Sequence, residues 1–500
     1  MRTAGGYSRD RGLAKSIDWW LVACWVLLVI IGWANIYASI HSTEPESIFD
    51  WGCRSGKQFV WIMTSVGIAG LILFLIPPRV YEGLSVPIYI FVLLLLVAVI
   101  FLGIEVKGSR SWFAFGPVRF QPAEISKIAT SLLLATIMSQ LGYRIGRLKD
   151  FVITALVILV PMMIIVLQSE TGSALVYVGF IFMLYREGLS GWLIFMVGMA
   201  ILLFILTISV SPYVAALTLA GVASLCICLY SGRFKWWLII CVPSIVLFSL
   251  LPYLFSLVPL LASVKPLWVL LGCCALALPF VAFQAFRERN FFTHLSIVSA
   301  LAGLLLIFSA DFLFNDVLQD HQRKRIEVLL GMKEDPSGVG YNVNQSKIAI
   351  GSGGFFGKGY LNGTQTTYGF VPEQSTDFIF CTIGEEWGFL GCAFVILLYV
   401  FLMWRIIHDA ERSREAFTRI YGYCVACCIF MHLFINIGMT IGLMPVIGIP
   451  LPFLSYGGSN MTTNMGGIAL VLNVTKNRSL SASISAPQTN TTTVRYIRRR

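Results

Sequence analysis

The chain has 500 residues and a formal net charge of +11, and its composition is 57% hydrophobic and 12% charged. About 25% of the residues in a soluble domain are charged, and a soluble chain of this length cannot bury so much apolar surface. The composition therefore excludes a soluble protein. The positive charge does not indicate nucleic-acid binding, because the basic residues are spread over short loops and termini and form no single face.

Apolar runs of about twenty residues recur along the whole chain, and this length crosses a bilayer as an α-helix. The strands of a transmembrane barrel would instead be alternating segments of about ten residues. The sequence predicts an all-α polytopic membrane protein with about 14 transmembrane helices. In chain order, the candidate spans are 17–39, 57–76, 85–104, 120–142, 151–168, 170–186, 191–209, 213–230, 236–260, 266–283, 293–314, 378–404, 417–442 and 455–475.

The distribution of Lys and Arg over the loops predicts the orientation of the chain. Basic residues cluster in the N-terminal segment and in the loops near 144–149, 233–235, 287–289 and 405–419. The positive-inside rule places all of these on the cytoplasmic side, together with both termini. The Arg-rich C-terminal end can then contact anionic lipid head groups. The segments predicted to lie outside are 108–119, 315–377 and 441–455.

The predicted external loop at 315–377 is long and polar, and it gathers glycines, cations and carboxylates that are scarce elsewhere. Its glycine-rich part looks like a phosphate loop, but Ser352 stands where the first glycine belongs, and Gly359 replaces the Ser or Thr that holds Mg²⁺. ATP and nucleotide sugars are also absent outside the cell, so we exclude a nucleotide site. Backbone N–H groups with Lys347 and Lys358 can still meet a phosphate, and a plain loop is the alternative.

Asp377 is the carboxylate in this loop that we single out, because the chain re-enters the membrane directly after it. Partial burial raises the pKa of a carboxylate and improves it as a general base. The structural alternative is an N-cap for the following helix, a position that Asp fills well. Glu373, Glu385 and Glu386 are nearby alternatives.

Ionisable residues also occur inside or at the ends of predicted spans. Glu124 and Lys127 are three residues apart, so they lie on one helix face and can form an ion pair. Ionisable groups at membrane depth are costly and by default mark a functional cavity, although a purely structural pair is the alternative. Glu170, at the outer end of another predicted span, is a similar case.

Two polar segments adjoin membrane spans on the outer side. Arg323 belongs to a basic run that is either a solvated stretch or a positively charged binding site for a pyrophosphate. Ser455 follows a run of Pro and Gly near the C-terminus. Broken helices occur at membrane depth only where they line protein or a cavity, so this segment either faces the substrate path or packs between helices.

Several of these residues lie in motifs that resemble the SEDS family (shape, elongation, division, sporulation) of bacterial peptidoglycan glycosyltransferases. The sequences Gly363-Thr-Gln365 and Gly448-Ile-Pro-Leu-Pro-Phe453 are more similar to those of the elongation members, RodA, than to those of the division members, FtsW. The supporting motifs are Phe120-Gln-Pro-Ala-Glu-Ile-Ser-Lys127, Asp320-His-Gln-Arg323, Gln345-Ser-Lys-Ile-Ala-Ile-Gly-Ser-Gly-Gly354, Gly357-Lys-Gly359, Gly363-Thr-Gln365, Pro372-Glu-Gln-Ser-Thr-Asp-Phe-Ile-Phe380 and Gly448-Ile-Pro-Leu-Pro-Phe-Leu-Ser-Tyr-Gly-Gly-Ser459.

The resemblance covers about 15–190 and 315–475, and it implies a helical bundle with a large extracytoplasmic loop. Between these parts the chain has about four apolar runs beyond the family's usual set of about ten. We therefore expect a cytoplasmic N-terminus (1–16), N-terminal SEDS helices (17–210), extra inserted helices (211–314), an extracytoplasmic catalytic loop (315–377), C-terminal SEDS helices (378–475) and a basic cytoplasmic tail (476–500).

The resemblance implies an inverting polymerase in the bacterial cytoplasmic membrane that acts during cell elongation. Lipid II, a disaccharide-peptide on undecaprenyl pyrophosphate, would be both donor and acceptor, and a class B penicillin-binding protein of the elongation machinery would be the partner. Asp377 would be the catalytic carboxylate. The candidate substrate-binding residues are Glu124, Lys127, Arg323, Lys347, Lys358, Glu373 and Ser455.

The leaving pyrophosphate develops negative charge, which Lys and Arg residues or a divalent cation, Mg²⁺ or Mn²⁺, would stabilise. No metal-binding residues and no nucleotide cofactor are predicted. Two other functions stay open, namely a lipid II flippase and a non-catalytic scaffold that recruits a transpeptidase.

Overall fold

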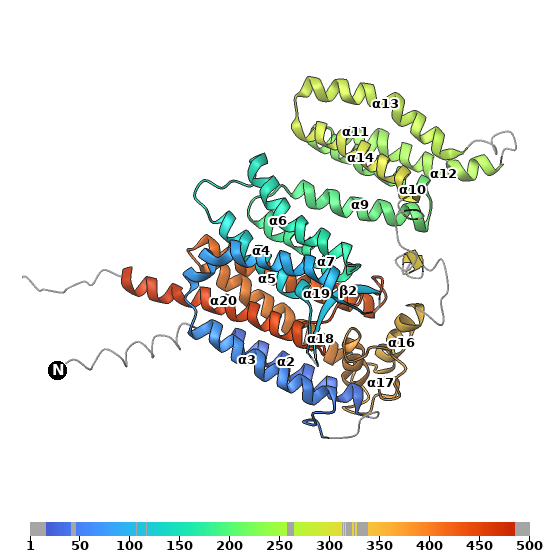
Figure 1. Cartoon of the computed structure of the whole chain (residues 1–500). Helices are drawn as coiled ribbons and strands as arrows, with labels where there is room; N and C mark the ends of the chain where they lie inside the picture. Colours follow the sequence, from blue (N-terminus) through green and yellow to red (C-terminus); the bar gives the residue numbers. More distant parts are fainter. Residues whose placement is uncertain are drawn as a thin grey trace, which may run out of the picture. The chain divides into compact units, whose positions relative to one another are not determined.

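The computed structural model (Figure 1) describes residues 17–41, 47–106, 108–116, 118–257, 265–312 and 339–485, and also Phe314, Asp316, Arg323, Lys324, Ile326 and Glu327. The predicted cytoplasmic N-terminus, most of the first half of the external loop and the end of the tail lie outside the described residues. The chain divides into two compact units, one formed by Met1–Gly188 with Gly340–Arg500 and the other by Leu189–Val339.

Helices dominate both units. Among the described residues, eleven helices are long and apolar enough to cross a membrane. The three other predicted spans are helical as well: α5 (Pro122–Met138) and the stretch Thr171–Arg186 are shorter, and α20 (Gly458–Ser485) is more polar. The prediction of an all-α polytopic membrane protein is confirmed.

The first unit contains most of the polar motifs found in the sequence. Its elements are α2 (Trp19–Ile40), α3 (Arg54–Phe74), α4 (Pro78–Leu102), β1 (Ile104–Val106), β2 (Ser109–Phe115), β3 (Val118–Phe120), α5, α6 (Leu148–Leu167), α7 (Thr171–Val176), the 3₁₀ turn η1 (Tyr177–Gly179), α8 (Phe180–Arg186), α16 (Val339–Ser352), α17 (Thr364–Thr367), α18 (Ile379–Arg412), α19 (Ala416–Thr440) and α20.

A small antiparallel sheet, in the order β1-β2-β3, lies between α4 and α5. The sequence predicted this stretch as an external loop that passes into a span at residue 120. The helix instead begins at Pro122, because proline fits the first turn of a helix, where its missing N–H is not needed.

Helix α19 lies at the centre of the first unit. It packs against α5, α18, α20 and α8, and 72% of its most apolar stretch is buried within the protein. Small residues on α19 permit this close packing: a methyl group on Gly422 would lie 2.8 Å from the Ala410 side chain on α18. In Figure 1 the C-terminal helix α20 (red) runs alongside α3 (blue), and these two helices are in extensive contact.

The second unit is a separate bundle. Its apolar core is formed by residues such as Leu203, Leu219 and Ile307. The elements are α9 (Gly191–Ser209), α10 (Pro212–Tyr230), α11 (Phe234–Trp236), the π-helical η2 (Trp237–Cys241), α12 (Val242–Leu257), α13 (Pro266–Glu288) and α14 (Phe291–Phe312).

Candidate active site

The backbone of the Asp377 segment is clamped at three consecutive carbonyl groups. The donors come from α19 and from the segment that links α19 to α20. They are Asn436 Nδ2 to the Asp377 carbonyl (2.8 Å), Ser455 Oγ to the Thr376 carbonyl (2.7 Å) and the Tyr456 N–H to the Ser375 carbonyl (2.8 Å). Ser455 Oγ also accepts a hydrogen bond from the Leu451 N–H at 2.7 Å, so this hydroxyl is used both as a donor and as an acceptor. The chain conformation on either side of Asp377 is therefore set by groups about 60 to 80 residues away in sequence.

The Asp377 side chain is half-buried, and its carboxylate lies close to Gly448. A Cβ placed on Gly448 would lie 3.3 Å from Asp377 Oδ2, and Gly448 has a positive φ of +74°. A side chain at position 448 would thus crowd the carboxylate and strain the backbone. Phe378, and not Asp377, occupies the N-cap of α18, so the capping alternative for Asp377 is wrong.

A buried polar cluster joins α5 to α19. Lys127 Nζ lies 2.8 Å from Glu124 Oε1, which is the ion pair expected from their spacing, and 2.7 Å from His432 Nε2. All three side chains are almost fully buried. If Nε2 accepts from the Lys127 ammonium, the proton of His432 resides on Nδ1, which can donate to the Pro450 carbonyl at 3.1 Å. These groups line a small cavity with Thr463 and Asn464 of α20.

The buried cluster and the Asp377 segment meet at two adjacent carbonyls. His432 and Asn436 are four residues apart on α19, so they lie on one face of the helix. His432 contacts the Pro450 carbonyl, and Asn436 donates to the Ile449 carbonyl at 2.7 Å as well as to that of Asp377. The segment after α19 is thereby linked through His432 to the buried ion pair and through Asn436 to the backbone carbonyl of Asp377.

The glycine-rich segment that looks like a phosphate loop is docked on an interruption in α18. Gly388 has φ 65° and ψ −160°, which breaks the helical hydrogen bonding. Two carbonyls before Gly388 accept hydrogen bonds from the glycine-rich segment: the Lys358 N–H donates to the Glu385 carbonyl (3.0 Å) and the Gly359 N–H to the Glu386 carbonyl (2.9 Å). Two N–H groups after Gly388 donate to the same segment: Phe389 to the Gly354 carbonyl (2.9 Å) and Leu390 to the Phe355 carbonyl (3.2 Å). The backbone N–H groups of 358 and 359 are therefore committed to α18.

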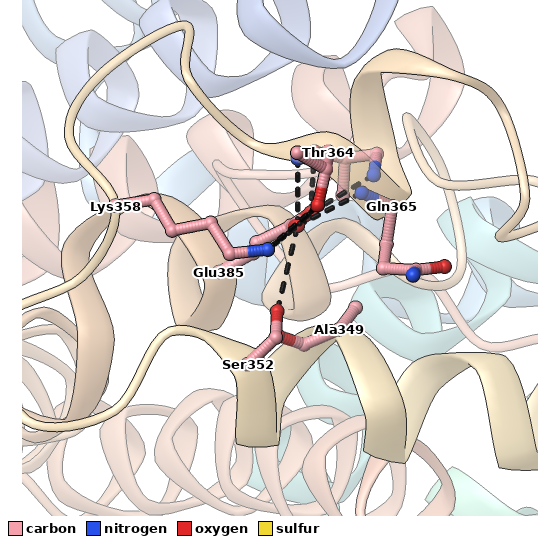
Figure 2. Close-up of polar contacts among 7 residues, drawn as sticks. Ala349, Ser352, Lys358, Thr364, Gln365 and Glu385 are labelled. Atoms are coloured by element: carbon pink, nitrogen blue, oxygen red, sulfur yellow. Dashed lines mark hydrogen bonds and ion pairs between the residues drawn. The ribbon is translucent and has the colours of Figure 1, made fainter.

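The side chain of Lys358 is also engaged by α18, as Figure 2 shows. Its Nζ lies 2.6 Å from Glu385 Oε1 and 2.7 Å from Thr364 Oγ1. Glu385 is fully buried, whereas the Lys358 side chain keeps 26% of its surface exposed. Lys358 is thus a partly exposed cation whose charge is shared with a buried carboxylate.

Comparison with known proteins identifies the chain. A model of the cell cycle protein family of FtsW, RodA and SpoVE matches residues 18–223 and 268–480. The chain belongs to this family. It is 31% identical to the peptidoglycan glycosyltransferase MrdB of Escherichia coli strain K12 over 411 residues, or 82% of each chain. It is 30% identical to the peptidoglycan glycosyltransferase RodA of Treponema pallidum strain Nichols over 469 residues, which are 93% of this chain and 99% of that protein.

The fold agrees with this family. A chain from a solved structure, titled "Structural coordination of polymerization and crosslinking by a peptidoglycan synthase complex", is similar with a TM-score of 0.58 and 24% identity, over 92% of this chain and 98% of that one. The predicted resemblance to the SEDS family, its RodA-like character and the peptidoglycan glycosyltransferase class are confirmed. The internal stretch between the two matched parts, 224–267, falls within the predicted extra helices.

The other predicted site residues of this family member occupy varied surroundings. Lys347 is exposed, and its side chain passes so close to Gly442 that a Cβ there would lie 2.3 Å from Lys347 Cε. Glu373 is exposed and accepts from Thr376 Oγ1 at 3.1 Å. Arg323 lies in the second unit and pairs with Glu327 at 3.1 Å. Its predicted neighbours 320–322 and 325 lie outside the described residues.

Sequence reasoning missed His432 and Asn436, which connect the two parts of the site. Both are polar residues within the apolar span Ala416–Thr440. A His and an Asn spaced four apart at membrane depth are a signal that would have singled out this helix face. Among the described residues, no group of three or more His, Cys, Asp or Glu side chains is arranged to hold a metal ion.

Proposed function

We propose that this glycosyltransferase polymerises lipid II into glycan strands at the outer face of the bacterial cytoplasmic membrane, during elongation of the cell, with Asp377 as general base. The single observation that supports this role most strongly is the clamp on the carbonyls of 375–377, which fixes the backbone that carries Asp377. A catalytic base needs such fixation, because the proton and the reacting atoms must be aligned within a fraction of an ångström.

In the proposed reaction, the Asp377 carboxylate takes the proton from a sugar hydroxyl of the acceptor. The hydroxyl oxygen attacks the anomeric carbon of the donor from the face opposite the leaving group. The bond between that carbon and the pyrophosphate oxygen breaks, and undecaprenyl pyrophosphate leaves with the electron pair. The new glycosidic bond therefore has inverted configuration, and the proton resides on Asp377 until it is passed to solvent.

Charge develops on the leaving pyrophosphate, and cations of the same unit would stabilise it. Lys347 is exposed and adjoins the end of α19, which carries Asn436. Lys358 would contribute through its exposed part, while Glu385 holds the other side of its ammonium group. Glu373 would contact the acceptor. Ser455 would act indirectly, because its hydroxyl donates to the Thr376 carbonyl and so fixes the backbone beside the substrate path. A phosphate-binding role for Arg323, in the second unit, stays a prediction.

The Glu124–Lys127 pair would shape the cavity beneath the loop. With His432 it forms a buried polar anchor that holds the Pro450 carbonyl. A polar anchor inside a span lets the following chain remain irregular at membrane depth, because its backbone groups find partners in the protein.

A divalent cation, Mg²⁺ or Mn²⁺, would be held mainly by the substrate. These ions often bind through one or two carboxylates together with phosphate oxygens and water. Asp377 and Glu373 are the carboxylates of this segment that fit such a role. The ion would add positive charge at the leaving pyrophosphate.

The proposed orientation has both termini in the cytoplasm and the loop that ends at Asp377 outside. It rests on the distribution of Lys and Arg over the loops. A class B penicillin-binding protein of the elongation machinery is the proposed partner. This is supported by the similar solved chain, whose title speaks of polymerization and crosslinking by a synthase complex.

The test uses the purified full-length chain, with its partner, and fluorescent lipid II. We expect glycan strands on a gel for the wild-type protein and none for Asp377→Asn, which keeps the shape of the side chain but removes the base. Glu411→Gln serves as the control, because Glu411 is a carboxylate at the other end of α18 that pairs with Arg186 at 2.6 Å, and it should retain most of the activity. Full polymer from Asp377→Asn would refute the assignment, and transfer of lipid II across vesicles without polymer would favour the flippase.

A further inference from the structure

The buried carboxylate of Glu385 is the shared hydrogen-bond acceptor for several groups of the segment that precedes Asp377 (Figure 2). Glu385 lies in α18 and has no exposed surface. Most of the groups that donate hydrogen bonds to its carboxylate belong to segment 358–366. The donors are Lys358 Nζ (2.6 Å), the N–H groups of Thr364 (2.7 Å), Gln365 (2.8 Å) and Thr366 (2.9 Å), the hydroxyls of Thr364 (3.2 Å) and Thr366 (2.9 Å), and Ser352 Oγ (3.5 Å).

The contacts from the Lys358 ammonium and from the three backbone N–H groups, at 2.6 to 2.9 Å, are strong hydrogen bonds. Three of the donors are the first N–H groups of α17, which have no partner within the helix. Bonds from such groups and from an ammonium to a carboxylate are charge-assisted, and they are about twice as strong as bonds between neutral groups. A carboxylate buried without these donors would be very costly, so Glu385 and segment 358–366 are stable only when they are together.

The position of Asp377 gives this network a consequence for catalysis. Thr366 and Glu385 are nineteen positions apart, and their hydrogen bonds close the chain between them into a loop. Asp377 lies near the middle of that loop. Within it, Val371 and Phe378 are buried in one apolar cluster with Ala349 and Cys381. Closing a loop at its ends reduces the conformations open to its middle.

We propose that Glu385 is a positioning residue for the transferase reaction. By holding the start of α17 against α18, it closes the loop that carries Asp377 and fixes the carboxylate relative to the acceptor hydroxyl. This inference rests on the proposed function of Asp377 as base. It assigns to Glu385 no contact with the substrate.

The experiment compares three substitutions in the full-length chain. Glu385→Gln keeps the size of the side chain but removes its charge, and it presents an amide N–H₂ to donors. Glu385→Ala removes the acceptor altogether. Glu411→Gln is the matched control, because Glu411 lies on the same helix and also pairs with a cation, Arg186, at 2.6 Å.

Two readouts are measured. Hydrogen exchange of peptides that cover 360–378 reports whether the loop is held, and initial rates over a range of lipid II concentrations separate kcat from KM. For Glu385→Gln we expect faster exchange in these peptides and a kcat lower by about 10²-fold, as for a catalytic group misplaced by about 1 Å, with KM close to wild type. Glu411→Gln should match the wild type in both readouts.

The possible outcomes separate this inference from the proposed function. Unchanged exchange in Glu385→Gln, or a defect confined to KM, overturns the positioning role. If Glu385→Ala does not fold, as judged by its elution and thermal unfolding, Glu385→Gln alone decides. A wild-type protein that makes no glycan, or an active Asp377→Asn, refutes the proposed function, and in that case the exchange readout still determines whether Glu385 closes the loop.

Discussion

The side-chain amide of Asn436 donates to the backbone carbonyl of Asp377 over 2.8 Å, across 59 positions of sequence. The same nitrogen donates to the Ile449 carbonyl at 2.7 Å. One buried amide on the central helix therefore sets the distance between the segment that carries the proposed base and the irregular segment that precedes α20.

Replacing Asn436 should impair both stability and turnover. Asn436→Ala leaves the buried Ile449 carbonyl and the part-buried Asp377 carbonyl without this donor, and an unsatisfied buried group costs about 1–3 kcal/mol. We expect a lower Tm in detergent micelles and a lower kcat for lipid II polymerisation. Thr440→Val, one turn later on the same helix, is the control, because its hydroxyl bonds only to the Ile437 carbonyl of its own helix. Equal effects of the two variants would contradict the proposed clamp.

The Glu124–Lys127 pair should show strong coupling in a double-mutant cycle. Glu124→Gln or Lys127→Met alone leaves one charge buried without its partner, which costs about 3–5 kcal/mol. The double variant should be less destabilised than the sum of the single variants, since both charges are then absent. Thermal unfolding of the four proteins measures the coupling. Strictly additive effects would show that the 2.8 Å contact does not stabilise the fold.

The two lysines predicted to bind phosphate should behave differently. Lys347 is exposed, so Lys347→Met should raise KM for lipid II by about fivefold, equivalent to about 1 kcal/mol, with kcat unchanged. Lys358 is held by Glu385, so Lys358→Met should lower kcat more than it raises KM. Initial-rate kinetics on matched preparations distinguish the two. A rise in KM alone for Lys358→Met would favour direct substrate binding by that residue.

The glycine-rich segment should tolerate a methyl group at one glycine and not at another. A Cβ at Gly357 would lie 2.1 Å from the Glu386 carbonyl oxygen, so Gly357→Ala must push the segment off α18. Gly354 also has a positive φ, but open space surrounds its Cβ position, so Gly354→Ala should cost only about 1–2 kcal/mol for the backbone conformation. We expect polymerisation to be lost in the first variant and retained in the second. The reverse order would show that the docking of this segment is not needed.

Local patterns in the sequence were sufficient for the helices and for part of the site. Apolar runs of about twenty residues predicted the spans, because the bilayer requires that length and that composition. The spacing of Glu124 and Lys127 predicted their ion pair, because residues three apart meet on a helix surface. The change from polar loop to apolar run at Asp377 drew attention to that carboxylate. Each of these inferences depends on residues that are close together in the chain.

Tertiary packing decided which distant groups complete the site. Lys127 meets His432 across 305 positions, and this contact exists only because α5 packs against α19. The interruption at Gly388 was likewise hidden, because its backbone groups are satisfied by a segment about thirty residues earlier. The sequence by itself determined the spans, the family and the proposed base. The partners that hold that base were decided only by the tertiary structure, because hydrogen bonds between distant residues leave no periodic pattern along the chain.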